Sequence, residues 1–215
     1  MKRSVLISTL PLLCAPGLAA CGDPRPRVSD VVHRRAEAPL ADELFTVAMA
    51  WTGVAGLRLE ARSDPADPSS PVTTLLVDPY VTRHSYAELA RPVDSDTATV
   101  EALFPKADAV LVGHAHHDHL ADVPALAART GATVYGSSST CAWVRALGPA
   151  SCVSISDQNV VRVGPFEVIV WESGHGRTAV GVPFPGEVED AQGPPWIWRW
   201  RMGGAFAFHV KAHGK

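Results

Sequence analysis

The chain has 215 residues, of which 47% are hydrophobic and 19% are charged, and its formal net charge is −3 at pH 7. This length and composition suit one globular domain with a core of its own. The charge is close to neutral and no basic run is interleaved with aromatic residues, so nucleic acid is not an expected partner.

Residues 1–20 are typical of an export signal. Lys2 and Arg3 form a basic start, an apolar stretch follows, and small residues lead up to Cys21. The stretch is too short and wrongly flanked for a spanning helix. A buried N-terminal helix is the alternative, but the stretch contains two prolines, which disfavour it.

The four residues 18–21, Leu-Ala-Ala-Cys, resemble the lipobox of bacterial lipoproteins. This resemblance implies that Cys21 is lipidated and anchors an exported protein to a membrane of the cell envelope. Gly22 follows the cysteine instead of an aspartate, which favours the outer membrane over retention at the inner one. We therefore expect an exported, lipid-anchored protein facing the periplasm or attached to the outer membrane.

Residues 21–43 are rich in proline and charge and predict a tether, so the domain is expected over 44–215. Strands alternate with helices and hairpins along it, which predicts a layered α/β fold. Helices are expected near 99–104, after residue 119 (with Asp122 as a possible cap, Pro124 in its first turn and Gly131 at its end) and over 140–148. Strands are expected over 45–51, 56–62, 72–79, 108–113, 132–136, 151–155, 166–173, 194–202 and 205–211.

Two cysteines, Cys141 and Cys152, remain in the mature domain. An exported compartment permits a disulfide between them. Two buried free thiols explain the same sequence equally well, and both alternatives stay open.

The segment 113–119, GHAHHDH, places four histidines and an aspartate between a buried strand and an amphipathic helix. The carboxyl ends of strands are where layered α/β folds assemble their sites. Imidazole nitrogens and a carboxylate are ligands for zinc and other borderline divalent metals. The segment therefore predicts a metal site rather than a polar loop.

The spacing of these side chains separates two sets of ligands. His114 and His116 are two residues apart on an extended chain, so they point the same way and can bind one ion. Asp118 and His119 follow where the chain turns into the helix, and they suit a second ion. Two metals about 3.5–4 Å apart can clamp the attacking and leaving oxygens of a hydrolysis. His117 is expected to face solvent.

The pattern His-x-His-x-Asp-His over 114–119 resembles the signature of the metallo-β-lactamase superfamily. The flanking chain is most similar to the branch of N-acyl-phosphatidylethanolamine phospholipase D and ascorbate-6-phosphate lactonase. The similar segments are WTGVAGLRLE, LLVDP ending on Asp78, and SGHGR containing His175. The resemblance implies an αββα sandwich.

The resemblance also implies roles for individual residues. His114, His116 and His175 would hold the first metal, and Asp118 and His119 would contribute to the second. Asp118 would also orient the attacking water. A further implied role is that of Asp78, which would hydrogen-bond the loop of ligands. The implied cofactor is one or two zinc ions, with manganese or iron as alternatives.

The family also needs a bridging aspartate and a last histidine, and neither is identifiable before Lys215. His209 and His213 precede the place where those ligands are expected. Gly203-Gly204 reads as a hairpin turn between two strands, and a further strand would be expected after 212–215. We therefore expect a sandwich truncated in its second half, and a chain that is a fragment.

Three tryptophans alternate at positions 196, 198 and 200, so a strand would place them on one face. Core packing explains them simply, while a rim facing a membrane or a lipid-like substrate is the alternative. His84 is expected to be an exposed loop histidine, although its loop could overhang the site.

The expected function is that of a metal-dependent hydrolase in which a metal-bound hydroxide attacks a phosphodiester, a lactone or another ester. The expected partners are a small or lipid-like substrate and a membrane reached through the anchor. A non-catalytic zinc-binding lipoprotein and an inactive fragment of such a hydrolase are the alternatives.

Overall fold

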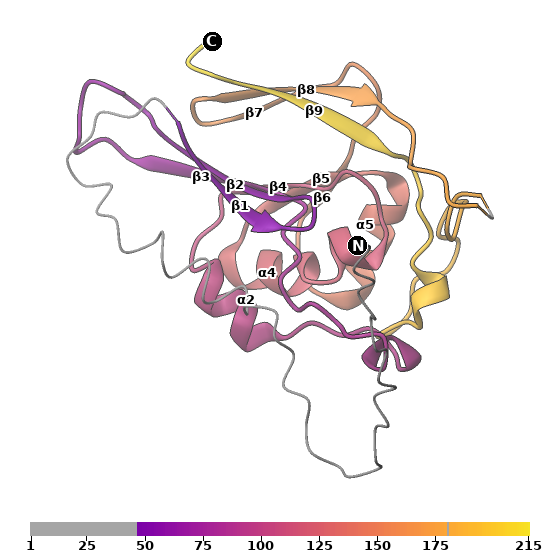
Figure 1. Ribbon diagram of the computed structural model, residues 1–215. Helices are drawn as coiled ribbons and strands as arrows, with labels where there is room; N and C mark the ends of the chain where they lie inside the picture. The colour runs from indigo at the N-terminus through magenta and orange to yellow at the C-terminus, as the bar shows by residue number, and fades with distance from the viewer. Residues whose placement is uncertain (1–46, 180) are drawn as a thin grey trace, which may run out of the picture.

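The computed structural model describes residues 47–179 and 181–215, so the predicted signal, Cys21 and the tether lie outside the described residues. The described part forms three layers, with helices, a six-stranded sheet and a three-stranded sheet following one another (Figure 1). This arrangement confirms the predicted α/β fold class. No helix within the described ranges has the length and apolar character needed to cross a membrane.

The six-stranded sheet occupies the middle layer, with its strands in chain order. The first three strands pair antiparallel, whereas β3 to β6 are parallel and are joined by helical crossovers. The strands are β1 (Ala48–Gly53), β2 (Gly56–Arg62), β3 (Val72–Val77), β4 (Ala109–Leu111), β5 (Thr133–Gly136) and β6 (Cys152–Ser154). A short loop, 113–116, leads from β4 towards the helix layer and contains the first two predicted ligands.

The helices cover one face of this sheet and bury a shared core. They are α2 (Thr97–Leu103), α3 (His117–Leu120), α4 (Val123–Thr130) and α5 (Ser138–Leu147), and a 3-10 turn, η1 (Glu88–Ala90), precedes them. Leu120, Leu126 and Trp143 are fully buried against the sheet. Pro124 lies in the first turn of α4 and Gly131 ends it with φ of 75°, as predicted.

Asp122 does not cap α4 with its side chain, contrary to expectation. Its fully buried carboxylate accepts hydrogen bonds from the backbone N–H groups of Val81 and Thr82, and from the hydroxyls of Thr82 and Ser95. It therefore ties down the segment that follows β3, because a buried carboxylate needs several donors to offset its lost hydration.

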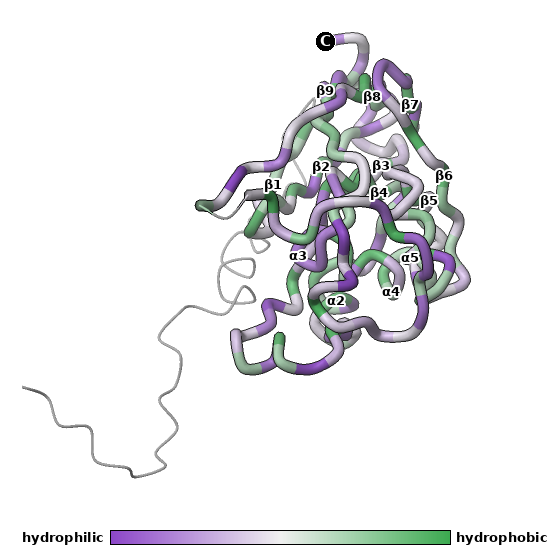
Figure 2. The backbone as a smooth tube through the Cα atoms, turned by 90° about the vertical axis from the view of Figure 1, so that its right-hand side faces the viewer, coloured by the Kyte–Doolittle hydropathy of each residue, from purple (hydrophilic) through white to green (hydrophobic). Residues whose placement is uncertain are grey.

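The second sheet packs on the opposite face of the first. Its antiparallel strands are β7 (Val160–Val163), β8 (Phe166–Glu172) and β9 (Phe206–Ala212), in that order. Phe166, Val168 and Val170 point inward and join Leu75 and Leu111 in a core between the sheets. Figure 2 shows the first sheet lying between these strands and the helices. Sequence reasoning did not identify β7.

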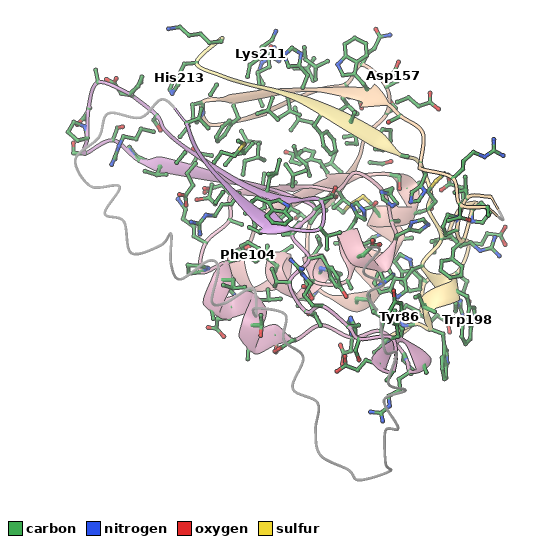
Figure 3. The ribbon with its side chains drawn as sticks, viewed as in Figure 1. Tyr86, Phe104, Asp157, Trp198, Lys211 and His213 are labelled. Carbon is green, nitrogen blue, oxygen red and sulfur yellow. A yellow bond between two sulfur atoms is a disulfide. The ribbon has the colours of Figure 1, made fainter. Side chains whose placement is uncertain are left out.

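The tryptophan-rich segment 194–202 is not a strand, because it contains a 3-10 turn, η2 (Ile197–Arg199). The predicted hairpin at Gly203-Gly204 is therefore wrong, and β9 pairs with β8 instead. Trp200 is buried 5.0 Å from the ring of Trp143, whereas Trp196 and Trp198 stack on each other and remain exposed. Trp198 points away from the body of the protein (Figure 3). The three rings therefore do not share one face.

A disulfide joins Cys141 on α5 to Cys152 on β6. This settles the alternative between a disulfide and two free thiols. The bridge fastens the last helix of the helix layer to the last strand of the six-stranded sheet.

Candidate metal centre

Three strand ends bring the predicted site residues together. β4 leads into the loop 113–116, Asp78 follows β3, and His175 comes three residues after β8. The backbone N–H of Phe206, at the start of β9, donates to the carbonyl of Gly113 at 2.7 Å. The two sheets therefore meet at the loop of ligands, and His175 reaches it from the second sheet.

His114, His116 and His175 converge on one point. Each offers one imidazole nitrogen, and these three atoms lie within 4.8 Å of one another. Nε2 of His114 is 2.9 Å from Nδ1 of His116, and the ring of His175 lies 4.8 Å from each of the other two rings. His114 and His116 are buried and His175 is half-buried. In the described part of the chain, this is the one group of such side chains close enough to hold a metal ion.

The surroundings of His114 and His116 favour the neutral, metal-binding form of these two imidazoles. Burial, with the charges of His119, His116 and His175, lowers the pKa of His114 to about 2. Burial and the charge of His175 also lower the pKa of His116. Nδ1 of His175 lies 2.6 Å from the carbonyl of Gly176, so it donates there and leaves Nε2 free to bind. The three imidazoles thus fit a divalent ion.

Asp78 braces the loop of ligands. Its Oδ1 accepts a hydrogen bond from the backbone N–H of Gly113 at 2.7 Å, and its Oδ2 lies 2.9 Å from Nδ1 of His119. The residue is buried and has a φ of 43°, a left-handed conformation that Asp and Asn tolerate better than other side chains. These contacts are those expected of the bracing role.

Asp118 and His119 lie beside the three converging histidines but outside that group. The ring of His119 is 3.9 Å from that of His114, and its Nε2 is 3.9 Å from Oδ2 of Asp118. Burial lowers the pKa of His119, but Asp78 and Asp118 outweigh burial and raise it overall. The assignment of Asp118 and His119 to a second metal stays a prediction.

His117 is not solvent-facing, contrary to expectation. Its ring makes an edge contact with Tyr80 at 5.9 Å, and 17% of its side chain is exposed. The hydroxyl of Tyr80 lies 2.9 Å from Nδ1 of His84, so His84 is also partly buried rather than an exposed loop residue. Sequence reasoning missed the contacts of Tyr80 with His84 and His117, because the start of α3 turns His117 towards Tyr80.

His209 and His213 lie away from the three converging histidines. β9 begins beside Gly113 at Phe206 and runs away from it, at roughly 3.3 Å a residue, so His213 lies some 20 Å along the chain. Figure 3 shows His213 at the far end of this strand. Neither histidine belongs to the group that could hold a metal.

This combination of layers and ligands defines a class of proteins. Two sheets packed face to face, a helix layer outside them and an HxHxDH loop after a buried strand are the features of the metallo-β-lactamase fold. The family described as beta-lactamase superfamily domain matches residues 73–197, which is more than half of the chain. The chain belongs to this family.

Curated relatives are similar to this chain over part of their length. A UPF0173 metal-dependent hydrolase of Cupriavidus necator is 32% identical over 133 residues, which is 62% of this chain and 38% of the relative. One from Cupriavidus taiwanensis is 32% identical over 129 residues, 60% of this chain and 38% of the relative. The chain thus spans well under half the length of these relatives.

Among solved structures, Igni18, a metallo hydrolase of Ignicoccus hospitalis, shares 15% identity with a TM-score of 0.49. That similarity covers 80% of this chain and 58% of Igni18. YhfI of Bacillus subtilis, a metallo-beta-lactamase fold protein, shares 18% identity with a TM-score of 0.41, over 74% of this chain and 51% of YhfI.

Proposed function

We propose that this protein is a metal-dependent hydrolase whose first metal is held by His114, His116 and His175. The observation that carries the proposal is the convergence of these three imidazole nitrogens within 4.8 Å. They follow strands of two different sheets, and burial lowers the pKa of both His114 and His116, which favours their neutral form. The relatives named above as metal-dependent hydrolases support the same conclusion.

The nitrogen donors fit zinc, and manganese or iron are the alternatives. A divalent ion in such a site supplies Lewis acidity and lowers the pKa of a bound water to about 7. Asp118 has 40% of its side chain exposed, so its carboxylate can orient the attacking water and accept its proton. His119 would join Asp118 at a second metal.

The proposed substrate is a phosphodiester, a lactone or another ester. This choice rests on the resemblance of the flanking strands to the phospholipase D and lactonase branch, and on Asp78 standing where that branch has its bracing aspartate. A substrate of this kind has a carbonyl or phosphoryl oxygen that a metal can polarise, and it releases an alkoxide that a metal can stabilise.

We place the protein outside the cytoplasm, anchored to the envelope through Cys21. The signal-like residues 1–20 and the lipobox support this location. The disulfide between Cys141 and Cys152 supports it independently, because such bonds persist mainly in oxidising compartments.

The test combines metal content with turnover. The purified chain is reconstituted with zinc, and its metal content is measured alongside hydrolysis of bis(p-nitrophenyl) phosphate and p-nitrophenyl butyrate. We expect at least about one zinc per chain and zinc-dependent turnover. His116→Ala should lose both, whereas His209→Ala, an exposed histidine on β9, should lose neither.

Two outcomes would count against the proposal. If His116→Ala retains zinc and turnover, the three histidines are not the site. If the chain binds zinc through these histidines but hydrolyses neither substrate, the non-catalytic zinc-binding protein is the better description.

A further inference from the structure

An aromatic side chain outside both cores lies against the candidate metal centre. The ring of Phe184 is 6.3 Å from that of His116 and perpendicular to it. Phe184 keeps 37% of its surface exposed and belongs to neither core cluster of the described residues. Its position therefore does not follow from core packing.

The backbone at Phe184 is held in an unfavourable conformation. Its φ is 39°, a region that a bulky side chain rarely occupies, and Pro183 and Pro185 restrict the chain on either side. Such strain persists only where the surrounding structure imposes it, and it gathers at ligand-binding sites. The strained backbone therefore accompanies a ring that lies beside His116.

Backbone hydrogen bonds connect Phe184 to the loop of ligands. Its carbonyl accepts from the N–H of Met202 at 2.9 Å, and the carbonyl of Met202 accepts from the N–H of Ala115 at 2.8 Å. Ala115 stands between the two histidines of the loop. A second bond, from the N–H of Gly203 to the carbonyl of Gly186, is also 2.9 Å long and holds the other end of the segment. The backbone that carries Phe184 is thus tied, through Met202, to the loop between His114 and His116.

We infer that Phe184 is a specificity-determining residue, whose ring forms an apolar wall that receives an apolar group of the substrate next to its reacting bond. The inference rests on the proposed function for the metal and goes beyond it in naming the substrate's chemistry. An aromatic or aliphatic group bound at the metal would contact the open face of the ring. A small polar substrate would gain nothing from it.

The test measures recognition without requiring turnover. The chain is loaded with Co²⁺, and its visible spectrum is titrated with acetohydroxamate and with benzohydroxamate. These two probes share a metal-binding head and differ by one aromatic ring. Phe184→Ala should lower the preference for benzohydroxamate by about tenfold, and Phe184→Leu should lower it less. The affinity for acetohydroxamate should stay within about twofold of the wild type.

Trp198→Ala is the matched control, because Trp198 is also an exposed aromatic residue but lies at η2 and points away from the body of the protein. It should leave the preference unchanged. The inference is overturned if Phe184→Ala keeps the wild-type preference, or if it weakens both probes equally. Phe184→Leu retains an apolar side chain of similar size and guards against a variant that does not fold.

The outcomes separate this inference from the proposed function. A chain that binds Co²⁺ and shows the Phe184-dependent preference, but hydrolyses no ester, contradicts the hydrolase and supports the apolar wall. A chain that does not bind Co²⁺ overturns both.

Discussion

The substitution Asp78→Asn should keep one contact of the Asp78 carboxylate, with Gly113, and change the other, with His119. The amide oxygen can still accept from the N–H of Gly113, and Asn tolerates the φ of 43° at this position. The amide nitrogen, however, replaces the oxygen that lies 2.9 Å from Nδ1 of His119. It would donate to Nδ1 and move the proton of His119 to Nε2, the nitrogen nearest Asp118.

The size of the effect follows from these contacts. A hydrogen bond to a charged group contributes about 1.5–3 kcal/mol and a neutral one about 0.5–1.5 kcal/mol, so we expect the free energy of unfolding to fall by about 1–2 kcal/mol. Loss of an outer partner of a metal ligand typically weakens binding by about 10–100-fold. This loss should fall on the second ion proposed at Asp118 and His119, because the three converging histidines keep their contacts.

The assay is a calorimetric titration of the metal-free chain with Zn²⁺ at pH 7, with urea unfolding alongside. Asp94→Asn is the control, because Asp94 is exposed and accepts only from the adjacent N–H of Ser95 among the described contacts. The reasoning is refuted if Asp78→Asn binds a second zinc as tightly as the wild type. It is equally refuted if the variant loses the first zinc instead.

Three further predictions follow from the site and the fold. His175→Ala should weaken the first zinc by more than about 100-fold in the same titration, since it removes a ligand and not only its support. In the metal-free chain, the folded state lowers the pKa of His114 to about 2, whereas unfolded His114 takes up a proton below about pH 6.5. The unfolded state therefore binds more protons than the native state as the pH drops from 7 to 5. Urea unfolding should show that the free energy of unfolding falls over this range. Replacing Cys141 and Cys152 with serine should lower the free energy of unfolding by about 3 kcal/mol, given the separation of 11 residues, and wild-type protein unfolded in reductant should match it.

Local sequence patterns predicted the loop 113–116 with its candidate ligands. They did not predict which segments far along the chain pack against this loop. His114 and His116 are neighbours because two residues of extended chain separate them, and spacing alone indicates this. His175 lies about sixty residues further on, and only the pairing of β8 with β9 brings it near Gly113. Its place could be expected from the family resemblance and from nothing in its own surroundings.

Tertiary contacts overruled local patterns in two places. The alternation of Trp196, Trp198 and Trp200 indicates a strand, but two prolines precede it and Trp200 is drawn into the core against Trp143. His117 follows an extended loop, yet it is the first residue of α3, and the change from a period of two to 3.6 turns it onto Tyr80. Both errors arise where extended backbone changes to a helical turn, at η2 and at the start of α3.

The geometry of the candidate metal centre depends on the backbone of residues 113–115 as much as on the imidazoles. Gly113 donates to Asp78 from the first sheet and accepts from Phe206 of the second, and Ala115 donates to Met202. A Cβ at Gly113 would stand 2.9 Å from Oδ2 of Asp78, so only glycine lets the carboxylate come this close. Because contacts from both sheets hold this short loop, the convergence of the histidines depends on how the two sheets pack together.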